Sequence, residues 1–184
     1  MTATNVNAAE ALVAMGPEPA VPADTERRVR HFLHYESWLL DERRFRDWVD
    51  LFTEDARYEL PVRVNREEGQ EAFSRSRAFD DNKQTLEIRV ERLHTEFAWS
   101  EQPPSRVRHY VANVMVAPGR ASDEFHVVSN ELVFRSRGDS VAYDLLSAQR
   151  VDCLRDSPNG LRISRRLVML DQTTLGAHNL SMFF

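Results

Sequence analysis

Four segments with alternating apolar and polar residues decide the fold: RHYVANVMVA (108–117), EFHVVSNELVFRSR (124–137), VAYDLLSAQRVDCLR (141–155) and LRISRRLVMLD (161–171). Alternation with a period of two is typical of strands that bury one face. Short turns rich in Gly, Pro, Asp and Asn separate the segments. This spacing predicts a meander of antiparallel strands, and strands this long must coil.

Helices are predicted upstream of this meander. Apolar residues recur at helical spacing over Thr25–Leu40, with Asp24 or Thr25 as N-cap, and over Arg43–Thr53. Residues 80–93 fit both helix and strand, and the Asp-Asp-Asn start favours a helix. A strand is expected around residues 58–62. Helices followed by a strand meander predict an α+β fold, with a curved antiparallel sheet closed by helices into a half-barrel or cone.

The 184 residues predict a flexible N-terminal arm over residues 1–23 and a single domain over residues 24–184. A hydrophobic share of 42% and a charged share of 29% are ordinary for a soluble globular protein. The net charge of -5 gives no electrostatic reason to expect binding to nucleic acid or to an acidic membrane. The sequence contains no long apolar span and no basic leader, so we expect a cytoplasmic protein.

Cysteine and motif content excludes several chemistries. Cys153 is the only cysteine, so this chain forms no internal disulfide and holds no cysteine-based metal site or iron–sulfur cluster. The sequence also lacks a glycine-rich phosphate loop, a G-x-S-x-G elbow and an H-E-x-x-H motif. His31 and His34 have no obvious third ligand, so they are only a weak metal signal.

Glu36 lies in the middle of the apolar arc of the first predicted helix. A carboxylate buried there must be paired or hydrogen-bonded, because an isolated buried charge is very costly. We expect a structural ion pair with one of the many arginines, and an acid that faces a pocket is the alternative.

Asp55, Tyr58 and His109 are the candidates for an enzyme site inside such a cone. A carboxylate desolvated by aromatic neighbours can act as a general base near neutral pH. The competing interpretation is structural. In that case Asp55 terminates the second helix, Tyr58 packs in the core, and His109 forms hydrogen bonds within the sheet or to a partner.

Other residues are candidates for subunit contacts. Trp38 lies on the helix face opposite the apolar arc, which favours a packing or subunit surface. Phe183 and Phe184 are expected to enter a core or a subunit seam. Arg106, Arg108 and His109, near the start of a predicted strand, are candidate intersubunit contacts.

Four long stretches are distinctive: FLHYESWLLDERRFRDWVDLFTEDARYELPVR (32–63), FDDNKQTLEIRVERL (79–93), AWSEQPPSRVRHYVANV (98–114) and LDQTTLGAHNLSMFF (170–184). Together they resemble one known family, the small (beta) subunits of bacterial aromatic-ring-hydroxylating dioxygenases. The resemblance covers nearly the whole chain after the arm. It implies the cone-shaped fold of the nuclear-transport-factor-like, or cystatin-like, superfamily.

The resemblance also implies a division of labour. A large (alpha) subunit is expected to carry a Rieske 2Fe-2S cluster and a mononuclear iron, while this chain holds neither. The resemblance implies an oxygenase of three large and three small subunits. This oxygenase would cis-dihydroxylate aromatic compounds with O2, and its electrons would come from NADH through a reductase and a ferredoxin. The resemblance implies no catalytic residue in this chain. The alternative is a free-standing dehydratase or isomerase of the same superfamily that uses Asp55, Tyr58 and His109.

Overall fold

The computed structural model describes residues 11–63, 73–93, 104–173 and 182–184. Within these residues, six strands form one sheet in the order β2-β1-β6-β5-β4-β3. The neighbouring strands are antiparallel, except that β1 and β6 are parallel. In chain order the labelled elements are α2 (Ala23–Asp41), α3 (Phe45–Val49), β1 (Phe52–Arg63), β2 (Phe73–Asn82), α4 (Lys83–Leu93), β3 (Ser105–Pro118), β4 (Glu124–Arg137), β5 (Tyr143–Ser157) and β6 (Gly160–Leu170).

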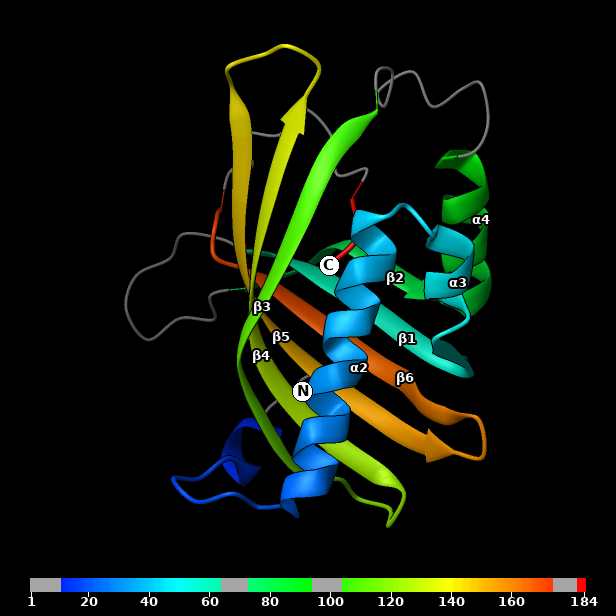
Figure 1. Ribbon diagram of the computed structural model, residues 1–184, viewed down its shortest axis with the longest axis vertical. Coiled ribbons are helices and arrows are strands. Elements are labelled where there is room, and N and C mark those ends of the chain that lie inside the picture. Colours follow the sequence, from blue (N-terminus) through cyan, green and yellow to red (C-terminus); the bar gives the residue numbers. More distant parts are fainter. Residues whose placement is uncertain (1–10, 64–72, 94–103, 174–181) are drawn as a thin grey trace.

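The predicted meander is confirmed. The four strands β3 to β6 follow one another in sequence and pair in that order, and β4 has the predicted bounds. A register shift in β3 between Ala112 and Met115 coincides with a positive φ of 53° at Asn113. Such a bulge bends its strand and increases the local twist. The sheet is strongly curved, and α2 lies along its concave face while α3 and α4 lie together beside β1 and β2 (Figure 1).

The first predicted helix is confirmed, but its predicted cap is wrong. Helix α2 begins at Ala23, and its N-cap position is Pro22, which makes no side-chain capping bond. Asp24 lies inside the first turn and pairs with Arg27 instead. The predicted apolar arc is buried against the sheet, as expected for an amphipathic helix.

The second predicted helix is much shorter than expected, because the chain becomes a strand earlier. Helix α3 ends at Val49, and β1 begins at Phe52. The backbone N–H of Ile163 in β6 donates to the Leu51 carbonyl at 2.8 Å, which ties this segment to the sheet. Pairing with β6, which is far away in sequence, therefore overrides the local helical pattern.

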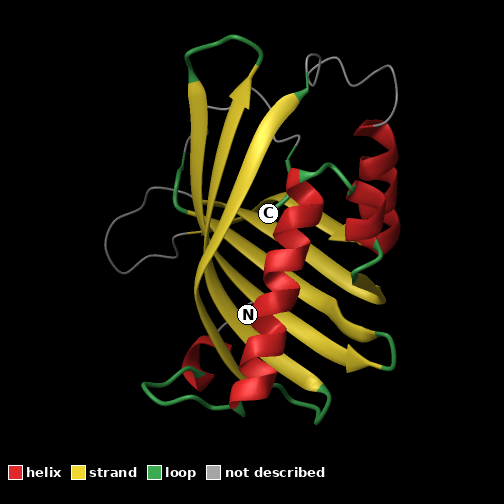
Figure 2. Cartoon of the chain, in the orientation of Figure 1, coloured by secondary structure: helices red, strands yellow, loops and turns green. Residues whose placement is uncertain are grey.

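The helix expected within residues 80–93 is confirmed as α4. The Asn82 side chain caps it by accepting from the Thr85 backbone N–H at 2.9 Å. Strand β2 was not predicted. It lies at the edge of the sheet (Figure 2). It has two register shifts against β1, and these irregular positions weaken the alternation that sequence analysis detects.

The core lies between the concave face and the helices, and a second small cluster lies on the convex face. In that cluster Ala11, from a helical turn over residues 11–14, is buried together with Val128, Val151 and Leu167. The described part of the predicted arm thus packs on its own sheet. No helix in the described ranges is long and apolar enough to span a bilayer.

Candidate functional site

A network of charged side chains occupies the middle of the cone, between α2 and the strands. Glu36 of α2 accepts hydrogen bonds from Arg166 of β6, with Nη2 at 2.9 Å, and from Arg150 of β5 at 3.2 Å. The indole N–H of Trp48 also donates to Glu36 at 3.0 Å. This confirms the predicted ion pair between Glu36 and arginine.

The same two arginines bind carboxylates on the sheet itself. Asp152 accepts from Arg166 Nε at 2.7 Å and Nη2 at 3.1 Å, and Glu131 accepts from Arg150 at 3.0 Å. Both arginines and Glu36 are fully buried. Burial alone would raise the pKa of Glu36, but Arg166 and Arg150 outweigh it and lower that pKa to about 2. The network is therefore charged at neutral pH, and each arginine is neutralised by more than one carboxylate.

Aromatic rings fill the space beside this network. The Trp48 ring lies 4.9 Å from Phe52 and 6.3 Å from Tyr58, measured between centroids. Phe183 lies 4.4 Å from Trp48 on the other side. Burial raises the pKa of Tyr58 to about 12, so its hydroxyl stays protonated near neutral pH.

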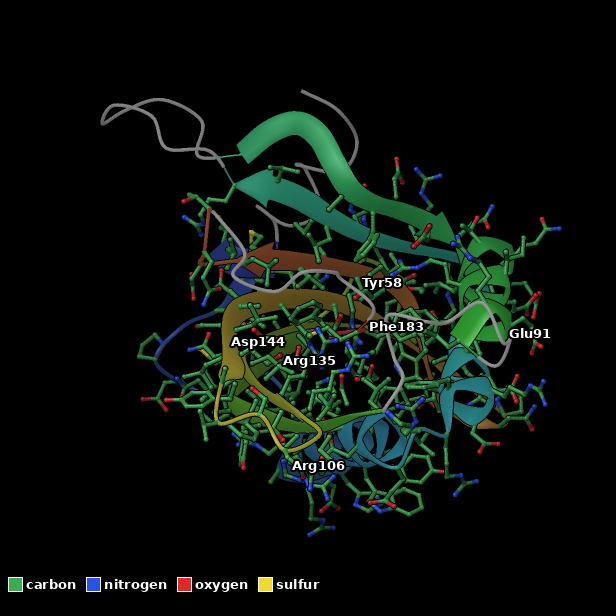
Figure 3. The ribbon with its side chains drawn as sticks, turned by 90° about the horizontal axis from the view of Figure 1, so that it is seen from above. Tyr58, Glu91, Arg106, Arg135, Asp144 and Phe183 are labelled. Atoms are coloured by element: carbon green, nitrogen blue, oxygen red, sulfur yellow. The ribbon has the colours of Figure 1, made fainter. Side chains whose placement is uncertain are left out.

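Residues 182–184 enter the cone and are held through their backbone. The Phe184 N–H donates to the Tyr58 hydroxyl at 3.1 Å, and the Phe184 oxygen accepts from Arg166 Nη1 at 2.9 Å. The Phe183 oxygen lies 3.1 Å from His109 Nε2. Seen from above, Phe183 and Tyr58 lie close together in the interior (Figure 3).

His109 joins residues 182–184, here called the tail, to α2. Its Nδ1 lies 2.7 Å from an oxygen of Asp41, and its Nε2 faces the Phe183 oxygen. Both partners are acceptors, so both ring nitrogens must carry a proton, as in the imidazolium form. Burial alone would lower the pKa of His109, but the bond to Asp41, with contributions from Glu131 and the Phe183 carbonyl, raises it.

The structure does not bring the three predicted catalytic residues together. Asp55 lies inside β1 rather than at a helix end, so its predicted role as a helix terminator is wrong. Its side chain is 65% exposed and binds Arg155 at 3.1 Å. Asp55 and Tyr58 are three residues apart in one strand, so they point to opposite faces, and only Tyr58 faces His109 and the interior.

The predicted contact residues fall into two groups. Trp38 is 46% exposed, stacked on Tyr35 with the Arg44 guanidinium 5.2 Å above its ring. Arg106 and Arg108 lie at the surface on β3. The side chains of the other group are buried inside the chain: His109, Phe183 and Phe184.

An exposed apolar area that sequence analysis missed adjoins these arginines on the convex face. Tyr110, two residues after Arg108, is 58% exposed and pairs across the strands with Leu132, which is 38% exposed. Leu145 and Tyr143 of β5 are also exposed, and Tyr143 lies against Phe134. The sequence signal for this area is that some outward-facing positions of β3 to β5, where polar residues are expected, hold aromatic or branched apolar residues.

One cavity in the described part of the cone lies next to Asp41, His109 and Phe183 and has a volume of about 30 Å³. A buried water needs about 10–15 Å³, so the cavity suits two or three waters rather than an aromatic substrate. Among the described residues, no group of three or more His, Cys, Asp or Glu side chains is placed to hold a metal ion.

The family model for the ring hydroxylating beta subunit matches residues 35–177. The chain belongs to the ring hydroxylating beta subunit family. It is therefore the small subunit of a multicomponent aromatic-ring-hydroxylating dioxygenase, an oxidoreductase, and such a beta subunit has an alpha subunit as its partner in a hetero-oligomer.

Curated relatives are similar to this beta subunit over most of their length. The biphenyl 2,3-dioxygenase subunit beta of Rhodococcus jostii (strain RHA1) is 36% identical over 91% of this chain and 92% of that protein. The 3-phenylpropionate/cinnamic acid dioxygenase subunit beta of Photorhabdus laumondii is 40% identical over 91% of this chain and 96% of that protein.

Solved structures confirm the fold. A chain of naphthalene 1,2-dioxygenase with indole bound matches with a TM-score of 0.84 at 22% identity, covering 100% of this chain and 95% of that one. A protein of Novosphingobium aromaticivorans assigned as a scytalone dehydratase matches with a TM-score of 0.61 at 16% identity, covering 84% and 87%. The cone predicted from the sequence is thus the observed fold.

Proposed function

We propose that this beta subunit is a non-catalytic scaffold of its oxygenase. The observation that carries the proposal is the filled interior. The place where a cone-shaped enzyme would need a substrate cavity contains the Glu36–Arg150–Arg166 network and the rings of Trp48 and Phe183.

The assembly would add both atoms of O2 to neighbouring ring carbons of an aromatic compound and give a cis-dihydrodiol. We place the Rieske 2Fe-2S cluster and the mononuclear iron in the alpha subunit, with electrons arriving from NADH through a reductase and a ferredoxin. The single cysteine of this chain supports that placement, since even a Rieske cluster needs two Cys and two His. We also propose three alpha and three beta subunits and a cytoplasmic location.

The exposed side chains on β3 are the proposed contact with the alpha subunit. Arg106, Arg108 and Tyr110 occupy alternate positions of one strand, so they share the convex face with Leu132. A contiguous apolar area bordered by arginine is typical of protein interfaces. Trp38 on α2 is proposed as a second contact, because an exposed stacked Trp is a frequent anchor of binding energy.

The free-standing dehydratase or isomerase is the weaker candidate. Its three residues do not converge, because Asp55 is an exposed partner of Arg155 while Tyr58 and His109 are bonded to the tail. The hydrogen bond from the Thr53 hydroxyl and the hydrogen bonds from Arg155 lower the pKa of Asp55, which is the opposite of what a base working near neutral pH requires.

The test is to purify this chain alone and together with the alpha subunit. We expect iron and arene-dependent O2 uptake only in the complex, and the complex with Asp55→Asn should keep full activity. Stoichiometric iron in the isolated chain, or turnover of any substrate by it, would refute the scaffold role. Turnover by the isolated chain that Asp55→Asn abolishes would favour the enzyme alternative.

A further inference from the structure

Residues 182–184 lie in the cone as a ligand lies in a binding site. Their side chains are buried, with relative exposures of 5%, 3% and 0% for Met182, Phe183 and Phe184. The tail is bound by side chains from strands that are remote in sequence, 126 residues away for Tyr58 and 74 for His109. Residues 182–184 therefore lie in a pocket whose walls are formed by other elements.

One part of this interior recognises an aromatic ring. The Phe183 ring lies 4.4 Å from Trp48 and 5.9 Å from Phe45, both on α3. The guanidinium of Arg89 on α4 lies 5.0 Å from the ring centroid. An aromatic face and a cation around a buried ring are favourable for any planar aromatic group of similar size, whatever chain it belongs to.

Another part recognises oxygen atoms. Arg166 donates to the Phe184 oxygen at 2.9 Å, and His109 Nε2 lies 3.1 Å from the Phe183 oxygen. Both groups are held in place without the tail, since Glu36 and Asp152 bind Arg166 and Asp41 binds His109. The donors are thus preorganised, and departure of the tail would leave them aimed at the same positions.

We propose that the cone of this subunit retains a latent binding site for an aromatic group that carries a hydrogen-bond-accepting oxygen, and that residues 182–184 are its resident occupant. The inference deepens the proposed scaffold role and rests on it, because it makes the tail the cause of the closed interior. Engineered apolar cavities of about 150 Å³ take up benzene, so a site vacated by phenylalanine rings is large enough to bind such a guest.

The test uses the beta subunit in its complex with the alpha subunit. A variant that lacks residues 182–184 removes both rings and also frees the donors Arg166 and His109, which the backbone oxygens of those residues otherwise occupy. Calorimetric titration with the peptide N-acetyl-Met-Phe-Phe amide should show one site per beta subunit, with affinity at least about tenfold above that of the wild-type complex. N-acetyl-Met-Ala-Ala amide is the matched control and should not bind. The wild-type complex reports any binding of the probe to the alpha subunit.

Equal binding to the wild-type and variant complexes, or equal binding of the two peptides, would overturn the proposal. If the variant that lacks residues 182–184 does not assemble, Phe183→Ala takes its place, with benzamide soaked into crystals of the complex. Benzamide stacked on Trp48 would support the latent site, and a slot that stays free of it would overturn the site. Neither result depends on iron or turnover in the isolated wild-type chain, which tests the scaffold role separately.

Discussion

At the scale of single residues, Glu36 illustrates both the reach and the limit of sequence reasoning. Its position in an apolar arc requires a buried partner, and the structure supplies one. The partners themselves, Arg150 and Arg166, are 114 and 130 residues away, so no local pattern identifies them. For Asp55 the sequence was misleading. Its aromatic neighbours in the sequence suggested a desolvated carboxylate, but their side chains lie on the other face of the strand.

Replacing Glu36 by Gln should strongly destabilise the fold. The substitution keeps the size of the side chain but leaves Arg166 and Arg150 short of buried negative charge, and breaking a buried pair typically costs about 3–5 kcal/mol. Guanidinium denaturation followed by circular dichroism measures the loss. Asp55→Asn is the control, since exposed pairs contribute only about 0–1 kcal/mol. A change at Glu36 as small as the control would contradict the structural role of the network.

The stability of the chain should also depend on His109 and on pH. The raised folded-state pKa means that this stabilisation is complete below about pH 6.5, the ordinary pKa of histidine, and is lost as pH rises through the folded-state value. The charged groups around the ring are Asp41 from α2 and Glu131 from β4, and Arg108 lies 3.7 Å from Asp41. Melting temperatures measured from pH 6 upward should therefore fall more for the wild type than for His109→Gln.

The control for this comparison is His31→Gln, a substitution at an exposed position of α2. Its melting profile should follow that of the wild type. Parallel profiles for the wild type and His109→Gln would show that the imidazolium does not contribute to anchoring the tail.

At the scale of elements, local pattern succeeded where strands are long and turns are short. The β3–β4 turn is a clear example, because Gly119 donates its N–H to the Glu124 carbonyl at 2.7 Å. Local pattern failed for α3 and β2. There the pairing of β1 with β6 and the irregular register at the sheet edge decide the backbone, and neither is encoded within a short window.

Gly119→Ala should destabilise the β3–β4 turn. A Cβ at this position would lie 2.5 Å from the Glu124 Cβ and 2.8 Å from its backbone carbon, so the turn must open. We expect a loss of about 1–3 kcal/mol, as for other overpacked sites. Gly16→Ala is the matched control, because no atom lies within 4 Å of its added Cβ. Thermal unfolding of the two variants checks the difference, and equal melting temperatures would show that the turn relaxes freely.

At the scale of the whole molecule, the two faces of the sheet differ in what covers them. The concave face is closed by α2, the charged network and residues 182–184. The convex face is covered near Val128 by the arm and exposes apolar side chains around Tyr110. The exposed apolar area on the convex face is suited to contact with other chains.

Reversing the charges of Arg106 and Arg108 should weaken assembly with the alpha subunit. Both side chains border the exposed apolar area, and Arg108 is 57% exposed, so the substitutions act on the surface rather than on the core. The control is Arg46→Glu/Arg57→Glu, which makes the same change in charge on α3 and β1. Size-exclusion chromatography of co-expressed subunits measures the complex. If the complex is unchanged with both double variants, the interface with the alpha subunit does not lie on this face.

The sequence by itself determined the strand meander, the first helix, the paired state of Glu36 and the family, because each depends on short-range periodicity or on quoted stretches of residues. Only the tertiary structure decided which arginines neutralise Glu36, that Asp55 faces outward, and that residues 182–184 fill the cone. These features arise from contacts between residues that are far apart in the chain. Their energies depend on burial and hydrogen bonding, which the order of residues does not reveal until the sheet has closed.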